Sequence, residues 1–526
     1  MLSYLNPLPS LPAYTGPHAV GSTEYEIPIS SLSLPALPEA QASKLRTLKF
    51  RLFYPTSPKT ASDSSSQGYG IPWLQEPQRA HLNAYLRLSG MKPWLSDFIL
   101  SSPFRYYLST TQIPAYHNAP LLCDGAKIPT LIFSHGLVGN MNTHSALLGE
   151  LASYGVVCLA LDHRDGSGPL TTLRKTASEA SGGDAATVPS EVGLANPPNV
   201  YYKPITLKIK PGMHEARDEQ LSIRLFELSA AYQALEMMND GHSFQNLAAE
   251  GGHPGKSGLT LPKGALDMAP GNVIWAGHSF GGTSTVQFVK SVYYFGRNGD
   301  DARSPLLWQD PSSTLKAQVT PHSPVVLLDP WFLPLRSPMT EMLLRKPLPC
   351  HDASAENGKN AARTVVLMCS EFAYHWPECH AHMPVVAGPN PSGVKVQTIE
   401  EYREEFARYK GPRDYMNKSK EQRANYLARA ESEKESDKAR RNSSQDSEEH
   451  VSMYVLHDTT HVTHCDFGIM FPWMVWWFTG QRKPVLATRN IARCILAETG
   501  VDSTMQMRGD ATVEKVRLEQ VSKLWT

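Results

Sequence analysis

The sequence predicts an α/β protein with a mostly parallel central sheet, flanking helices and several surface insertions. Residues 129–134 and 156–161 are short apolar runs typical of buried strands, and a helix is expected between them over 143–154. A strand, a helix and a second strand in this order form the unit of a parallel sheet, so a right-handed crossover is expected. The third observation is an apolar strand that leads into a glycine-rich turn and a helix over residues 273–289.

That turn has the sequence GHSFGG at residues 277–282. It matches G-x-S-x-G, a pattern in which a serine occupies a strained turn between a strand and a helix. Side chains at positions 277 and 281 would collide with nearby backbone, which explains the two glycines. The amides at the start of the following helix favour a developing negative charge. A chance match is the alternative, but the flanking strand and helix favour Ser279 as a nucleophile.

A second loop suited to ester chemistry follows the strand at 129–134. It reads HGLVGN over residues 135–140, and a strand followed by H-G-x-x-G can supply a backbone N–H to an oxyanion hole. We expect the N–H groups of Leu137 and Phe280 to be the two donors. Without Ser279 the loop would read as an ordinary glycine turn.

Two acidic residues stand at the ends of later strands. The apolar run 324–328 ends at Asp329, and the run 364–368 is followed closely by Glu371. Open parallel sheets place their sites at the carboxyl ends of strands, so Asp329 is expected to orient a histidine, with Glu371 as the alternative. Two earlier acids are expected only to structure a strand-end loop: Asp162 and Asp165.

Three histidines, His457, His461 and His464, follow the short strand expected at 453–456. A serine nucleophile needs a neutral imidazole as general base, and any of the three can supply it. Their spacing also raises the hypothesis of a metal site, but the H-E-x-x-H pattern is absent. The sequence therefore favours a base and predicts neither a metal nor another cofactor.

Overall composition excludes several classes of partner. The 526 residues include 50 basic and 50 acidic side chains, so no net charge favours nucleic acid. The seven cysteines lack zinc spacing, and no disulfide framework is expected. No apolar run approaches the ~20 residues that span a bilayer, and the N-terminus does not resemble a secretory signal. A cytoplasmic protein is predicted, and the sequence does not define its oligomeric state.

One catalytic domain is expected over residues 1–526. Residues 1–44 are rich in proline and serine and are predicted to form an irregular arm, in which residues 16–28 are the most strand-like piece. Segments predicted to be insertions are 166–204, 337–363 and 376–450, the last of which contains a mixed charge run.

Residues 71–108 are aromatic and apolar without a regular period. They are expected to form a helical cap over the site. The alternative is a surface that dips into a lipid interface, and both can hold at once.

Blocks across most of the chain resemble the platelet-activating factor acetylhydrolases of the plasma and type II intracellular kind, which have the α/β-hydrolase fold. The blocks that carry the resemblance are GPHAVGST from Gly16, IPAYHNAP from Ile113, FSHGL from Phe133, LASYG from Leu151, DHRDGS from Asp162, GHSFGG, LDPWFLPL from Leu328, SE at Ser370 and THVTHCDF from Thr460.

The resemblance implies a triad of Ser279, Asp329 and His461, with Leu137 as an oxyanion donor, and so selects His461 among the three histidines. It also implies calcium-independent hydrolysis of short or oxidised sn-2 acyl chains from glycerophospholipids. The family's interfacial helix would fall near residues 94–104, which implies peripheral contact with a membrane or lipoprotein-like surface. The chain differs from the animal enzymes in its insertions, at Val138, where they commonly have glycine, and at His464, where an apolar residue is usual.

Three functions remain open from the sequence. The first is a serine esterase acting on phospholipid sn-2 esters, and the second is a hydrolase of the same fold acting on other small esters. The third is a hydrolase-like scaffold that binds lipid or a partner without turnover. A pure binding protein has no need of a strained serine, which argues against the third.

Overall fold

The structure is a computed structural model, and its description covers most of the chain. The described residues are 10–35, 37, 45–57, 69–102, 105, 109–174, 199–248, 259, 261–297, 304–352, 364–396, 398, 400–401, 404, 450–479, 483–502 and 513–516.

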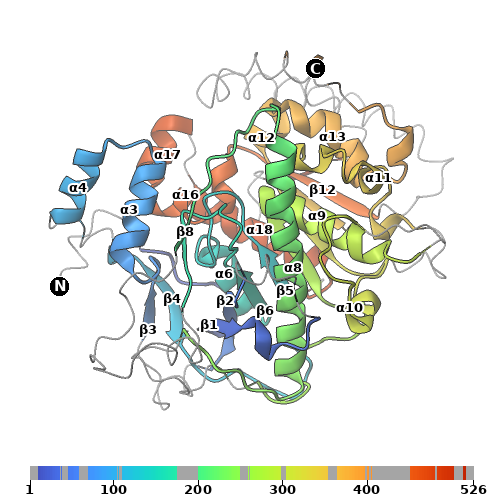
Figure 1. Ribbon diagram of the computed structural model, residues 1–526. Coiled ribbons are helices and arrows are strands. Elements are labelled where there is room, and N and C mark those ends of the chain that lie inside the picture. The colour runs from blue at the N-terminus through green and yellow to red at the C-terminus, as the bar shows by residue number, and fades with distance from the viewer. Residues whose placement is uncertain are drawn as a thin grey trace, which may run out of the picture.

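An eleven-stranded sheet forms the centre of the described part of the chain (Figure 1). Its strand order is β13-β12-β11-β10-β9-β5-β6-β2-β1-β4-β3. The six neighbours from β12 to β6 all run parallel, and antiparallel pairs join β13, β2, β1 and β3 to the rest. The bounds are β1 Ala19–Pro28, β2 Thr47–Thr56, β3 Tyr69–Pro72, β4 Gln112–His117, β5 Thr130–Ser134, β6 Val157–Leu161, β9 Ile274–His278, β10 Val325–Leu328, β11 Thr364–Cys369, β12 Val451–Leu456 and β13 Val513–Val516.

The parallel strands are apolar on both faces because helices cover both sides of the sheet. In β5, Ile132 packs into one hydrophobic cluster, whereas its neighbours Leu131 and Phe133 pack into the other. Helices α8 (Met213–Asn239) and α9 (Phe280–Tyr293) contribute to the first cluster. Helices α6 (Ser145–Ser153) and α18 (Pro484–Glu498) contribute to the second. Continuous apolar strands between two helical layers confirm the predicted α/β class.

Shorter helices surround these layers. They are α3 Gln78–Leu88, α4 Pro93–Ser101, α10 Ser313–Gln318, α11 Glu341–Leu344, α12 Ser370–His375, α13 Pro377–Ala387, α16 Phe467–Met470 and α17 Pro472–Thr479. Residues 71–108, predicted as a cap, therefore contain two helices, and Figure 1 shows them at the same end of the molecule as α17.

The prediction of an irregular arm over residues 1–44 is wrong for its middle part. Residues Ala19–Pro28 form β1, which lies inside the sheet and pairs with β2 and β4. The polar side chains of this strand concealed it, because each has a buried partner: Arg51 Nη2 donates to Glu24 Oε2 at 2.8 Å, and Thr47 Oγ1 donates to Glu26 Oε1 at 2.8 Å.

The first predicted insertion, 166–204, also begins inside the fold. Ser167 and Leu170 are fully buried, and β7 (Leu170–Thr172) pairs with β8 (Asn199–Tyr201) in a separate two-stranded sheet. The glycine and serine content predicted a surface loop here. Ser167 is instead held by buried charged groups, because its Oγ donates to Asp165 Oδ1 and accepts from Arg224 Nη2. Part of each predicted insertion lies outside the described residues: 175–198 in the first, 353–363 in the second and most of 397–449 in the third.

Helix α9 carries a buried lysine whose replacement is expected to stabilise the protein. Lys290 is 2% exposed, and its Nζ has no hydrogen-bond partner among the described residues. Burial lowers the pKa of Lys290 from 10.5 to about 7, opposed slightly by Cys350. The unfolded chain therefore binds a proton between about pH 7 and pH 10.5 that the folded state does not, so this lysine costs progressively more stability as the pH falls through that range.

Lys290→Met is expected to raise the free energy of unfolding by about 1–3 kcal/mol at pH 7, since each unit of pKa shift corresponds to about 1.4 kcal/mol. The gain should shrink towards pH 10. Urea unfolding of both proteins at the two pH values measures it, and a gain that is equal at both would contradict the explanation.

Candidate active site

Ser279 occupies a strained turn between β9 and α9. Its φ is +55° and its ψ is −117°, a conformation that L-residues rarely adopt. The turn is held by the Ser279 N–H, which donates to Leu328 O at 2.9 Å, and by the Trp331 N–H, which donates to Ser279 O at 3.0 Å. A Cβ at Gly277 would collide with the backbone of Gly281, and a Cβ at Gly281 would collide with Ser134 O. The expected need for both glycines is confirmed.

The loop after β5 lies against this turn. Val138 has a φ of +62°, and its N–H donates to Ser167 O at 2.7 Å. Within the described residues, neither the Leu137 N–H nor the Phe280 N–H donates to a protein acceptor. If Gly136 had a side chain, its Cβ would lie 3.0 Å from Ser279 Cβ, so the loop and the serine are in close contact. Two free amides beside a strained serine are what an oxyanion hole requires.

Sequence reasoning missed a buried arginine that ties these two segments together. Arg224 Nη1 donates to His135 O at 2.7 Å, and its guanidinium lies 4.5 Å from the centre of the Phe280 ring. Asp165 Oδ2 accepts from Arg224 Nε at 2.6 Å. Burial would raise the pKa of Asp165, but Arg224 and Ser167 lower it below its usual value. An arginine among the apolar residues of α8 was the available signal.

The two earlier acids belong to structural pairs, as expected. Asp165 pairs with Arg224, and Asp162 Oδ2 lies 3.7 Å from Lys49 Nζ. Both carboxylates are fully or almost fully buried.

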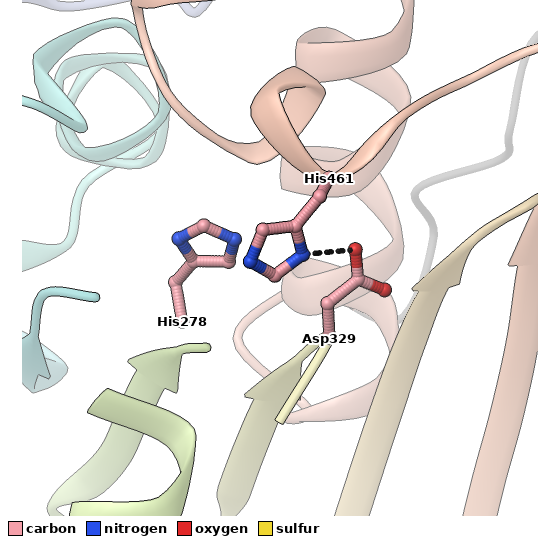
Figure 2. Close-up of side chains that lie close together, drawn as sticks. All are labelled: His278, Asp329 and His461. Atoms are coloured by element: carbon pink, nitrogen blue, oxygen red, sulfur yellow. Dashed lines mark hydrogen bonds and ion pairs between the residues drawn. The ribbon is translucent and has the colours of Figure 1, made fainter. Parts of the chain in front are cut away.

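Asp329 faces the ring of His461, and Figure 2 shows the contact. His461 Nδ1 and Asp329 Oδ2 are 3.1 Å apart, and Asp329 Oδ1 accepts the Cys369 N–H at 2.7 Å. Asp329 is fully buried with a φ of +40°, directly after β10. Burial would raise the pKa of this carboxyl, but the charge of His464 and the hydrogen bond with His461 hold it well below its usual range.

Glu371, the alternative acid, contacts the backbone of the same histidine and not its ring. Its Oε2 accepts the His461 N–H at 2.9 Å. His461 begins a short 3-10 helix, η7 (His461–His464), so Glu371 fixes the start of that turn. The arrangement favours Asp329 as the partner of the imidazole.

The three histidines of the 457–464 segment do not form one group. Among the described residues, the sets of side chains close enough to ligate one metal are His278, Asp329 and His461, and Asp329, Cys369 and His464. His457 belongs to neither, so the hypothesis that His457, His461 and His464 bind one metal is wrong.

Two further histidines, His278 and His144, extend from His461 into the interior of the protein. The ring centres of His278 and His461 are 4.6 Å apart, and His144 Nε2 lies 3.2 Å from His278 Nδ1. Burial, with smaller effects from neighbouring imidazoles, holds the pKa of both His144 and His278 well below the usual range. Burial therefore favours the neutral form of both rings.

Asp466 anchors the histidine turn to the rest of the site. Its carboxylate accepts from Trp73 Nε1 at 2.8 Å and from the backbone N–H groups of Ser145 and Ala146, both at 3.0 Å. Burial raises the pKa of Asp466 to about 7 despite these donors. One carboxylate thus joins the loop of His461, the start of α6 and the segment that leads to α3.

The parallel sheet, the serine in its strained turn and the carboxylate–imidazole pair at neighbouring strand ends define an α/β-hydrolase fold. The family model for "Platelet-activating factor acetylhydrolase, isoform II" matches residues 5–350. The chain belongs to this family. Leu137, Ser279 and Asp329 lie inside the matched stretch, and His461 lies beyond it.

Individual relatives agree with that assignment. A protein of Schizosaccharomyces pombe named "Putative phospholipase A2" is 31% identical over 54% of this chain and 60% of its own length. The platelet-activating factor acetylhydrolase of Canis lupus familiaris is 32% identical over 47% of each chain. The chain thus spans about half the length of the curated relatives it matches. A ferulic acid esterase structure from Streptomyces cinnamoneus aligns with 97% of this chain and 99% of its own, at 13% identity and a TM-score of 0.41.

Proposed function

We propose that this protein is a serine esterase that uses Ser279 as nucleophile, His461 as general base and Asp329 to orient the imidazole. The observation that carries the proposal is the strained serine at the end of β9, next to the Asp329–His461 pair that begins at the end of β10. A serine held at that cost in backbone energy, at a strand end next to the one that bears the acid of an oriented imidazole, is an arrangement suited to acyl transfer.

In this mechanism Ser279 Oγ attacks the ester carbonyl while His461 takes the hydroxyl proton. Negative charge develops on the carbonyl oxygen, where the N–H groups of Leu137 and Phe280 would stabilise it. His461 then returns the proton to the departing alcohol, which leaves an acyl group on Ser279. Water, deprotonated by His461, releases the acid and restores the serine. Asp329 stabilises the imidazolium in both halves.

The proposed substrates are glycerophospholipids with an acetyl or oxidised short sn-2 chain, cleaved without calcium. The family supports this class, and the animal relatives are named platelet-activating factor acetylhydrolases.

The test incubates the purified protein in chelator with a 2-acetyl phosphatidylcholine, a long-chain 2-acyl phosphatidylcholine and a soluble ester, and measures the released acid. Protein blocked with a serine-directed phosphonate serves as the blank. Release of acetate but not of the long-chain acid is expected. Turnover of the soluble ester alone would instead support a hydrolase for other small esters, and no turnover of any substrate would support a non-catalytic scaffold.

We further propose that the end of the molecule bearing α4 and α17 contacts lipid. Trp94 and Phe98 on α4 are 67% and 65% exposed, and Trp473 and Trp476 on α17 are 63% and 50% exposed. Helix α4 packs on α3, and α17 packs on α16. The rings of Tyr85 on α3 and Phe467 on α16 lie 5.7 Å apart, so this contact links the two pairs of helices. Within the described residues, no helix has the length and apolarity to cross a bilayer. Exposed tryptophans suit a peripheral contact.

Replacing Trp94 and Trp473 with serine is expected to weaken binding to phosphatidylcholine vesicles at least tenfold. Burial of each ring in the interface contributes about 2 kcal/mol to the binding free energy. Vesicle sedimentation measures the partitioning. The rate on a soluble ester should be unchanged. Met339→Ser, which removes an exposed apolar side chain elsewhere, is the matched control and should bind normally. Equal binding by all three proteins would contradict the proposed surface.

A further inference from the structure

Asp329 has a second imidazole neighbour besides His461. His464 Nε2 lies 3.2 Å from Asp329 Oδ2, the same oxygen that contacts His461 Nδ1 at 3.1 Å. The His464 side chain is fully buried, whereas that of His461 is 22% exposed. Neither ring nitrogen of His464 has an aligned hydrogen bond within the described residues. The polar edge of His464 therefore has the carboxylate of Asp329 as its principal electrostatic partner.

One turn of chain brings the two histidines to a single oxygen. Both belong to η7, where a Thr460–Thr463 capping box closes the turn. His461 and His464 stand at its first and last positions, and side chains three residues apart in a 3-10 helix lie on the same side. Asp466, two residues on, fixes the end of the turn on α6 through the contacts described above.

The negative charge near Asp329 Oδ2 is too small to compensate protonated rings of both His461 and His464. The titratable groups that face His464 are Asp329, Cys369, His278, His144 and His461. Among these described groups Asp329 is the only anion, because burial raises the pKa of the Cys369 thiol well above its usual value. Glu371, a second carboxylate at this turn, contacts the backbone N–H of His461. Burial favours the neutral form of His144 and His278. A single carboxylate can compensate one imidazolium, so His461 and His464 compete for it.

We propose that His464 is a positioning residue that shares the Asp329 carboxylate with His461 and so keeps His461 neutral in more acidic media. This inference rests on the proposed function only for its effect on hydrolysis. An N–H on His464 Nε2, which lies 3.2 Å from Oδ2 without being aligned with it, or a proton held on His464, reduces the negative charge available to an imidazolium at position 461. The base therefore stays unprotonated, and ready to accept the proton of Ser279, at lower pH than with Asp329 to itself.

The experiment compares wild type with His464→Leu and His464→Gln. Histidine-selective ¹⁵N labelling and NMR follow the titration of His461 in each protein, assigned with His461→Gln. In His464→Leu the titration midpoint of His461 is expected to move to higher pH by about one half to one unit. Glutamine keeps an N–H donor without taking a proton, so its shift should be smaller. This readout needs no substrate and holds whether or not the protein is an esterase.

The same variants are then assayed for kcat/KM on a soluble ester between pH 4 and 9. The acid limb of the profile is expected to move with the NMR midpoint, while the rate on the alkaline plateau stays within about threefold of wild type. Loss of packing alone would lower the whole profile without moving its limb.

His457→Leu is the matched control, since His457 lies in the same segment but in neither group around Asp329. Its His461 midpoint should equal that of wild type. A midpoint that is unmoved in His464→Leu, or moved equally in His457→Leu, would overturn the inference. An absence of esterase activity in wild type with a shifted NMR midpoint would refute the proposed function and leave the shared carboxylate established.

Discussion

Ser279→Ala is expected to lose ester hydrolysis by about 10⁵- to 10⁶-fold in kcat while remaining folded. Loss of the nucleophile removes the acyl-enzyme route, and only binding and oxyanion stabilisation can still assist water. Alanine fits the site because it removes one oxygen and keeps the Cβ, and the turn itself is held by backbone bonds of Ser279. Initial rates on a soluble ester, with thermal unfolding as the check on folding, give the result.

A serine near the end of α9 supplies the control for that measurement. Ser291 is also fully buried, and its Oγ accepts from Gln287 Nε2 at 3.3 Å, away from the turn. Ser291→Ala is expected to keep its rate within about twofold. If Ser279→Ala retained more than about one hundredth of the wild-type rate, another nucleophile would have to be sought.

Asp329→Asn is expected to lower kcat by about 10⁴-fold with little change in KM. An amide would offer the wrong group to the imidazole and could not stabilise the imidazolium, which is the effect known for this substitution in serine proteases. The shape of the side chain is preserved, and the amide oxygen can still accept the Cys369 N–H that now binds Oδ1. Steady-state kinetics over a range of ester concentrations separates kcat from KM.

Glu371→Gln is the comparison that decides between the two acids. Its side chain accepts a backbone N–H from His461, and an amide oxygen can do the same, so a loss below about tenfold is expected. A larger loss in Glu371→Gln than in Asp329→Asn would exchange their roles.

The elements that the sequence predicted correctly are those with a strong local signal. The strands β5, β6, β9, β10 and β11 are continuous apolar runs, and the turn at Ser279 needs glycine at fixed positions. These features depend on neighbours close in sequence, so periodicity and motif spacing capture them.

The features that the sequence did not predict depend on distant partners. β1 contains Glu24 and Glu26, and only their pairing with β2 and its surroundings makes a buried strand of them. Arg224 looked like one polar position on a core helix, yet it binds the loop before Leu137. The position of His464 against Asp329 joins residues far apart in sequence, and no local pattern reports that distance.

The order of strands in the sheet has a consequence for unfinished chains. Ser279 and Asp329 follow β9 and β10, but His461 follows β12, which pairs with β11 and arrives late in synthesis. A product truncated before residue 451 would carry Ser279 without His461, the proposed base. It would also leave β11, with the sequence TVVLMC, as a bare sheet edge open to pairing with another molecule. Premature termination would thus yield an aggregation-prone polypeptide that lacks the proposed base.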